Sequence, residues 1–243
     1  MSDIIKHECG IVLIRLLKPL DYYRKKYGSA RYALNKLHLL MEKQHNRGQD
    51  GAGIACIKFD VEPGERYIGR FRSNAPQALR EIVEKVNSYF EEIRINEPSK
   101  LNDTDYLKDQ VPFIGELLMG HLRYGTFGKN SIESCHPFLR QNNWRSRNLV
   151  MAGNFNMTNV EELFNVLVDL GQHPKDKVDT VTVMEKIGHF LDEEVQGLFI
   201  KYKDQFTNKE VSDIIETELN LQNVLRRACK DFDGGYTMAG MIG

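Results

Sequence analysis

The sequence has few cysteines, and their arrangement suits neither a disulfide framework nor a zinc site. Its 243 residues contain Cys9, Cys56, Cys135 and Cys229, with no CxxC and no paired spacing. Small secreted domains and zinc modules are both built on paired cysteines. We therefore expect no metal site and a reducing, cytoplasmic environment.

A strong net charge and long apolar runs are also absent. Lysine and arginine number 33 against 34 acidic residues, so the formal net charge of −1 provides no electrostatic footprint for nucleic acid. The apolar run GIVLI near the start ends at Arg15 and is far shorter than a membrane span. The first eight residues are polar and lack the apolar core of a secretory signal. The sequence thus predicts neither a nucleic-acid partner nor a membrane partner.

Strand-like and helix-like segments alternate along a chain that is long enough for a sizeable core. Hydrophobic residues make up 41% and charged residues 28%, which is typical of a globular protein. Strands are predicted at residues 9–17, 51–59, 64–72, 117–128, 148–155 and 234–243. Helices are predicted in the second half of 21–48 and at 74–95, 158–171, 179–191 and 208–230, with a polar loop at 96–110. Because it ends on an apolar strand, we expect the chain to be cut before its fold is complete.

Glycine and polar residues gather in four stretches at the ends of predicted strands. The stretches are HECG (7–10), QHNRGQDGAG (44–53), GHLRYGTFG (120–128) and AGNFNMTN (152–159). Glycine lets the backbone approach a ligand closely, although glycine and asparagine are also ordinary turn formers. Four such stretches together with an early cysteine indicate a functional site.

In this order, the motifs CGIV, RGQDGAGI, GHLRYGT followed by HPF, GNFNMTN, VDTVT and DGGYTMAG resemble the glutaminase domain of the class-II glutamine amidotransferases. The sugar-isomerising members favour tyrosine where this chain has Gln49, so the resemblance favours the phosphoribosyl branch. It implies an α+β fold over residues 9–243, a four-layer αββα sandwich of the N-terminal-nucleophile hydrolase type. Residues 1–8 would be a propeptide.

Cys9 is the nucleophile that this resemblance implies. Its thiol would attack the side-chain amide of glutamine, and its own α-amine, with a reference pKa of about 7.7–8.0, would act as the base. That amine is free only after Met1–Glu8 have been removed. The alternative is that Cys9 is a small core residue at the edge of a strand.

The resemblance assigns the oxyanion donors to the Asn154 side chain and the backbone N–H of Phe155. The usual family pattern is Asn-Gly-Asn, whereas this chain has Asn154, Phe155 and Asn156. A side chain at the glycine position restricts the backbone, so the hole is displaced or forms only with a substrate or partner. The alternative is an asparagine-rich turn before a helix.

Substrate recognition is assigned by the same resemblance to Arg123, Asp179 and Thr126. A guanidinium binds a carboxylate through two parallel hydrogen bonds, so Arg123 would hold the α-carboxylate of glutamine. Asp179 would pair with the substrate ammonium. The alternatives are a surface arginine at a strand end and an aspartate that caps a helix.

The loop that contains Arg47 resembles the wall beside the nucleophile, although Asn46 is inserted before this arginine. We expect Arg47 to line the site and Asp50 to be structural. The remaining histidines and cysteines of these motifs fit no ligand spacing and are expected to be structural: His45, His121, His136, Cys56 and Cys135.

The family transfers ammonia to phosphoribosyl pyrophosphate in a second domain, whose acidic phosphoribosyl-binding loop is absent from this sequence. The expected partners are therefore glutamine and a missing C-terminal phosphoribosyltransferase domain. Magnesium is expected only with that domain, and no cofactor with this one. Three alternatives remain: another acceptor such as a sugar phosphate, another amide hydrolase, or a non-enzymatic assembly or regulatory module. Arg123 and Asp179, which suit a free amino acid, argue against the second. The sequence leaves open whether the chain forms a homo-oligomer.

Overall fold

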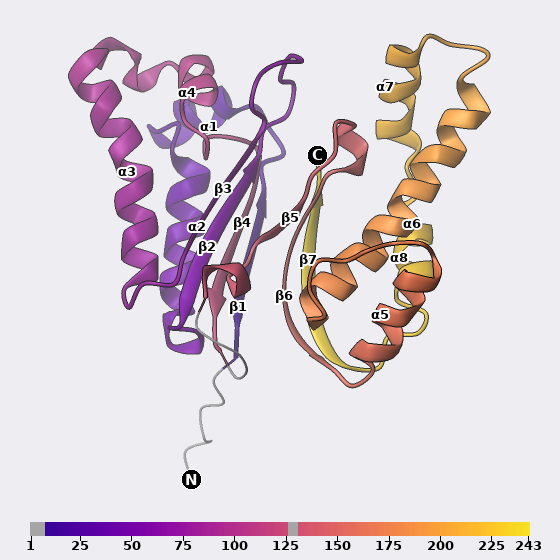
Figure 1. The fold of residues 1–243 in the computed structure, drawn as a ribbon. Helices are drawn as coiled ribbons and strands as arrows, with labels where there is room; N and C mark the ends of the chain where they lie inside the picture. The colour runs from indigo at the N-terminus through magenta and orange to yellow at the C-terminus, as the bar shows by residue number, and fades with distance from the viewer. Residues whose placement is uncertain (1–7, 126–130) are drawn as a thin grey trace. The chain divides into compact units, whose positions relative to one another are not determined.

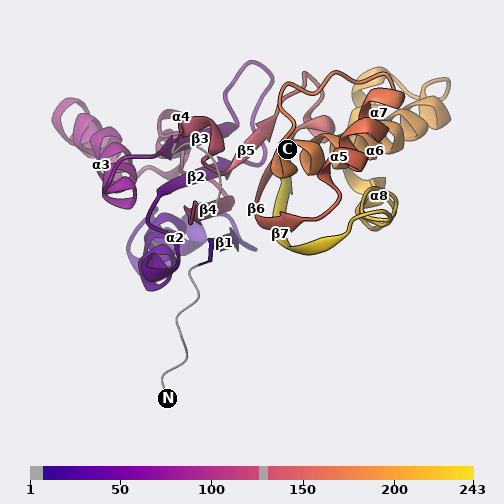
Figure 2. The same ribbon diagram turned by 60° about the horizontal axis from the view of Figure 1, so that its bottom comes forward.

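Seven strands and eight α-helices form two compact units in the computed structural model, which describes residues 8–125 and 131–243. The first unit comprises Met1–Phe138 with Ala152–Asn154, and the second comprises Leu139–Met151 with Phe155–Gly243. Figure 1 and Figure 2 show the elements of each unit. The units are described separately below.

A four-stranded antiparallel sheet is the centre of the first unit. Its strands are β1 (Gly10–Arg15), β2 (Gly51–Ile57), β3 (Ile68–Ser73) and β4 (Leu117–Arg123), in the order β1-β4-β2-β3. Every residue of β2 is buried, as expected of a central strand made of small and branched apolar residues. The pairing of Gly10 with Leu122 places the residue before β1 beside the end of β4.

Two amphipathic helices, α2 (Tyr32–Lys43) and α3 (Ala78–Asn96), pack on this sheet (Figure 1). The buried residues of α2 recur at helical spacing, as do those of α3, because each helix turns one apolar face to the strands. The sequence predicted that the second helix begins near Asn74. It begins at Ala78 instead, and the Ser73 hydroxyl accepts a hydrogen bond from the Ala75 N–H before it.

Two shorter helices were not predicted from the sequence. Helix α1 (Leu20–Tyr27) ends at Gly28, whose φ of 75° suits glycine, and the polar loop predicted at 96–110 contains α4 (Thr104–Gln110). The Asp103 carboxylate caps α4 by accepting a hydrogen bond from the Tyr106 N–H at 3.0 Å. The loop prediction was wrong because only Thr104 and Leu107 of this helix are buried, which is too few for a clear apolar period.

The second unit combines most of a three-stranded sheet with four helices. The strands β5 (Phe138–Arg140), β6 (Leu149–Met157) and β7 (Gly234–Ile242) run in the order β5-β6-β7. The helices are α5 (Val160–Asp169), α6 (Asp179–Tyr202), α7 (Asn208–Glu218) and α8 (Leu221–Ala228). Helix α6 is the centre of the helical layer, since α5, α7 and α8 all contact it.

The helix predicted at 208–230 is two helices. A capping box joins Thr207 and Glu210 at the start of α7, and the Asn220 side chain accepts a hydrogen bond from the Asn223 N–H at 2.9 Å to start α8. The sequence signal was the pair Leu219-Asn220, in which asparagine is a preferred cap. Helix α6 also extends to Tyr202, well past the predicted end at Leu191.

Aromatic and charged contacts tie α6 to the segment between β5 and β6. The Trp144 ring meets Phe199 edge to face at 5.3 Å, and Arg147 lies over Trp144 at 5.4 Å. On β5, Arg140 forms ion pairs of 3.1 Å with Glu185 and 2.6 Å with Asp192. In the part of the chain that the structure describes, no helix is long and apolar enough to cross a bilayer.

Candidate functional site

Cys9 lies immediately before β1 and beside the end of β4. The Tyr124 N–H donates to Cys9 Sγ at 3.5 Å, and Cys9 Sγ lies 3.8 Å from the Tyr124 carbonyl oxygen. The thiol is half-buried rather than enclosed in the core. By contrast, Cys56 is fully buried, and burial raises the pKa of its thiol to about 12, which leaves it protonated at neutral pH.

Arg123 ends β4 and is buried at 7% exposure, next to the position of Cys9 in the strand pairing. A Cβ on Gly125 would come within 3.0 Å of an Arg123 guanidinium nitrogen, so glycine leaves room for this side chain. The Asp50 N–H donates to the Arg123 carbonyl at 3.0 Å, and the Asp50 carboxylate accepts from the Gly125 N–H at 2.8 Å. Asp50 thereby fixes the backbone on both sides of Tyr124.

Arg47 belongs to a short 3-10 helix, His45–Arg47, between α2 and β2. Its guanidinium lies 2.9 Å from the carboxylate of Glu8, the residue directly before Cys9. Both side chains are about half exposed, so the ion pair positions the chain more than it stabilises the fold. A Cβ on Gly48 would lie 2.7 Å from the Arg123 carbonyl carbon, which shows how closely this loop crosses the end of β4.

Two buried histidines hold the peptide unit that precedes Asn154. The His121 Nε2–H donates to the Gly153 carbonyl at 3.1 Å, and the Gly153 N–H donates to His136 Nδ1 at 3.0 Å. The two imidazole rings stack at 4.3 Å with an interplanar angle of 18°. We call these two residues the histidine pair. The histidine pair holds both the N–H and the carbonyl of Gly153 and so positions the backbone that leads into Asn154.

Both members of the histidine pair are kept neutral by their surroundings. Burial lowers the pKa of His121 to about 4, and burial together with the neighbouring His121 lowers the pKa of His136 well below 6.5. A neutral imidazole can accept at Nδ1, as His136 does, whereas a protonated one cannot. The sequence motifs contained both histidines, but nothing in their spacing indicated that they grip the same glycine.

The other two oxyanion and substrate candidates belong to the second unit. Phe155 follows Asn154 in β6 and is half-buried. Asp179 is the first residue of α6, and its carboxylate accepts the Thr180 N–H at 2.6 Å. Burial raises the pKa of Asp179. Thr126 lies outside the described residues, as do Met1–His7 of the predicted propeptide.

The structure therefore brings Cys9, Arg47, Arg123 and Asn154 into one unit, and Phe155 and Asp179 into the other. Among residues 8–125 and 131–243, no three His, Cys, Asp or Glu side chains gather as a metal site requires. The arrangement in the first unit combines a half-buried thiol, a buried guanidinium and a fixed asparagine backbone. These are groups that can attack a carbonyl, bind a carboxylate and donate to an oxyanion.

Comparison with solved structures identifies a similar fold. The fold is similar to that of a chain described as "Structure of the allosteric regulatory enzyme of purine biosynthesis". The TM-score is 0.50 at 17% identity, and the match covers 96% of this chain and 35% of that one. Together with the antiparallel sheets and the helices of the two units, this similarity confirms the predicted α+β fold class.

No family model matches the chain, but its sequence is similar to those of several amidophosphoribosyltransferases. The chain is 28% identical to amidophosphoribosyltransferase of Lacticaseibacillus casei over 150 residues, which is 62% of this chain and 61% of the relative. It is 27% identical to the Archaeoglobus fulgidus enzyme over 203 residues and 26% identical to a chloroplastic enzyme of Arabidopsis thaliana over 182 residues. Those matches cover 84% and 75% of this chain but 32% and 24% of the relatives. The predicted resemblance to the glutaminase domain of amidophosphoribosyltransferases is confirmed.

Proposed function

We propose that this chain hydrolyses the side-chain amide of glutamine and supplies the ammonia to an amidophosphoribosyltransferase reaction. The observation that carries the proposal is the position of the Cys9 thiol beside the buried Arg123 at the end of β4. A thiol can attack the side-chain amide of an amino acid, and a guanidinium can bind its carboxylate. The similarity to amidophosphoribosyltransferases supports the same reaction.

The reaction begins with removal of Met1–Glu8, which leaves the α-amine of Cys9 free. This amine takes the thiol proton, the thiolate attacks the amide carbon, and a tetrahedral oxyanion forms. The protonated amine then returns its proton to the departing nitrogen, and ammonia leaves a thioester on Cys9. Water attacks the thioester while the amine accepts its proton, which yields glutamate and restores the thiol.

Asn154 and Phe155 donate to the oxyanion through the side-chain amide and the backbone N–H, respectively. The histidine pair supports the first donor because it fixes the Gly153 peptide. Losing one such donor typically raises the barrier by about 2.7–4 kcal/mol. Phe155 in place of the family's glycine favours a second candidate, an assembly or regulatory module with the same fold and impaired catalysis.

In this proposal Arg123 binds the α-carboxylate of glutamine, Asp179 pairs with its ammonium, and Thr126 is a further substrate-binding residue. Arg47 has two successive roles in this proposal. Before processing it holds Glu8, the last residue of the propeptide, at 2.9 Å. After processing its guanidinium is released beside the new N-terminus.

The acceptor of ammonia is phosphoribosyl pyrophosphate, bound by a second domain outside residues 1–243. The greater length of the Archaeoglobus fulgidus and Arabidopsis thaliana relatives supports this arrangement. Magnesium belongs to that second domain, and the cytoplasmic location stays a prediction. A different acceptor, such as a sugar phosphate, would leave every step at Cys9 unchanged.

A glutamine-analogue electrophile tests the proposal at the thiol. The chain is prepared in two forms, one with residues 1–8 and one that begins at Cys9. We expect the label on Cys9 of the second form alone, with protection by glutamine, and we expect none on the half-buried Cys229. Cys9→Ala is the matched control. Full glutamine hydrolysis by the form that retains all eight residues would refute the processing step, and an unlabelled processed form would favour the non-enzymatic module.

A further inference from the structure

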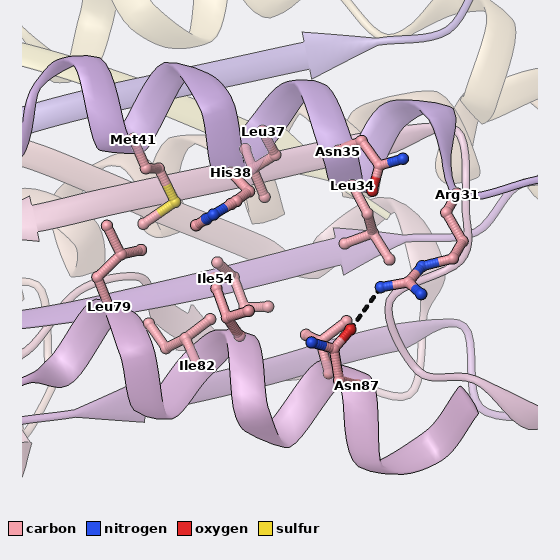
Figure 3. Close-up of a pocket in the computed structure, with 12 residues that line it drawn as sticks. Arg31, Leu34, Asn35, Leu37, His38, Met41, Ile54, Leu79, Ile82 and Asn87 are labelled. Carbon is pink, nitrogen blue, oxygen red and sulfur yellow. Dashed lines mark hydrogen bonds between the residues drawn. The ribbon is translucent and has the colours of Figure 1, made fainter. Parts of the chain in front are cut away.

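A cavity of about 210 Å³ lies in the first unit between α2 and α3, over the middle of β2 (Figure 3). Apolar side chains form most of its wall: Leu34, Leu37 and Met41 from α2, Leu79 and Ile82 from α3, and Ile54 from β2. Both helices pack chiefly on the sheet rather than on each other, which leaves this space between them. None of these residues belongs to the site described above.

One end of the cavity is polar and positively charged. The Arg31 guanidinium donates to the Asn87 side-chain oxygen at 2.5 Å (Figure 3). It also lies 4.1 Å from the centre of the Phe90 ring. Its Nε–H is buried and has no hydrogen-bond acceptor among the described residues. No described carboxylate lies within 4.0 Å of Arg31, and Glu91 acts on it only from a greater distance.

This half-buried guanidinium is therefore partly withdrawn from water, and no close anion among the described residues compensates for the loss. Burial lowers the pKa of Arg31 because the charged form is poorly solvated. A carboxylate would restore the balance, since a guanidinium can offer it two parallel N–H donors. Beyond Arg31 most of the wall is apolar, and α2 adds two polar lining residues, Asn35 and His38. The Nδ1 of His38 is also buried without a partner in the described chain.

We propose that this cavity binds a small amphiphilic monocarboxylate, with the carboxylate on Arg31 and the hydrocarbon chain between α2 and α3. An apolar cavity of roughly 150 Å³ holds one benzene molecule, so about 210 Å³ suits a chain of about six to eight carbons. The proposal does not depend on the function of Cys9.

Calorimetric titration of the full chain with straight-chain carboxylates tests this site. From butyrate to octanoate the affinity is expected to rise about fourfold for each added methylene, because each buried CH₂ contributes a similar free energy. Octanol is expected to bind at least about tenfold more weakly than octanoate, since it lacks the charge that pairs with Arg31. Equal affinities for butyrate and octanoate, or for octanol and octanoate, would overturn the proposal.

Variants locate the ligand within the cavity. Arg31→Met keeps the apolar stem and is expected to lower octanoate affinity about tenfold or more while leaving octanol unchanged. The matched control is Arg80→Met on α3, whose guanidinium is exposed and pairs with Glu84. Val83→Phe fills the cavity and is expected to abolish binding of both ligands.

Thermal melts establish that each variant is folded before it is titrated. If Arg31→Met does not fold, Arg31→Lys replaces it and is expected to weaken octanoate binding, because an ammonium cannot form the two parallel bonds. Unchanged octanoate binding in both the Arg31 and the Val83 variants would place the ligand elsewhere. Loss of binding in His38→Asn but not in the Arg31 variant would assign the carboxylate to His38 and refute the proposed orientation.

Discussion

The histidine pair offers the sharpest test of how the fold supports chemistry at Cys9. Replacing His136 by leucine keeps an apolar side chain of similar size but removes the Nδ1 acceptor of the Gly153 N–H. His121 then holds the Gly153 carbonyl alone and loses its stacking partner. The backbone that positions Asn154, the next residue, would then be held by one hydrogen bond instead of two.

The expected size of the effect follows from the lost hydrogen bond. A buried N–H without a partner costs about 1–3 kcal/mol, and His136 is only 7% exposed, so little water can replace the acceptor. If the same 1–3 kcal/mol is added to the activation free energy, the kcat for glutamine hydrolysis drops by roughly 5- to 150-fold. The KM for glutamine is expected to change little, because Arg123 is untouched.

The assay measures kcat and KM of the processed chain together with alkylation of Cys9 by iodoacetamide. His136→Gln is the matched variant, since its side-chain oxygen can accept from the Gly153 N–H, and it is expected to recover most of the lost kcat. Hydrogen exchange at the Gly153 amide should rise in the leucine variant and remain slow in the glutamine variant. The reasoning is wrong if the leucine variant keeps full kcat, or if alkylation falls as much as kcat does.

Four further outcomes are expected. Arg123→Lys should raise the glutamine KM far more than it lowers Cys9 alkylation; equal losses would indicate a structural role. Gly53→Ala should destabilise the chain by about 3 kcal/mol or more in a urea melt, because a Cβ would lie 2.0 Å from the His136 carbonyl oxygen. Gly197→Ala, in the interior of α6 with nothing within 4 Å, should instead stabilise it by about 0.5–1 kcal/mol, and loss of stability there would contradict the helix assignment. In the folded chain the pKa of His121 is about 4, below its ordinary 6.5, so between these values the unfolded chain binds a proton that the folded chain does not. The free energy of unfolding should therefore fall as the pH drops from 6.5 towards 4. His121→Asn should reduce this fall, and an equally steep fall in the variant would contradict the assignment to His121.

The sequence predicted the local elements that have strong periodicity or clear ends. The strands at Gly10–Arg15 and Gly51–Ile57 and the helix at Ala78–Asn96 were found because their apolar residues recur regularly. Helices α1 and α4 were missed, since each buries only one or two residues. A short helix held by one cap and one contact leaves no repeating pattern to detect.

The sequence motifs identified most residues of the candidate site, but they did not predict the contacts between them. The order of the motifs identified Cys9, Arg123 and Asn154 as site residues. The pairing of β1 with β4 explains why Cys9 and Arg123 lie at the same end of the sheet. The hydrogen bonds from His121 and His136 to Gly153 join residues 32 and 17 positions apart in the chain. The Arg47–Glu8 pair likewise joins residues separated by 39 positions, and neither spacing carries a sequence signal.

Trp144 gives the molecule a built-in optical reporter. It is the sole tryptophan of the chain, and both it and its contact Phe199 belong to the second unit, so its fluorescence reports on that unit. Most tyrosines, including the stacked rings of Tyr23, Tyr27 and Tyr32, belong to the first unit. Fluorescence selective for indole and absorbance selective for phenol will therefore show, without any label, whether the two halves melt as one cooperative body or in succession.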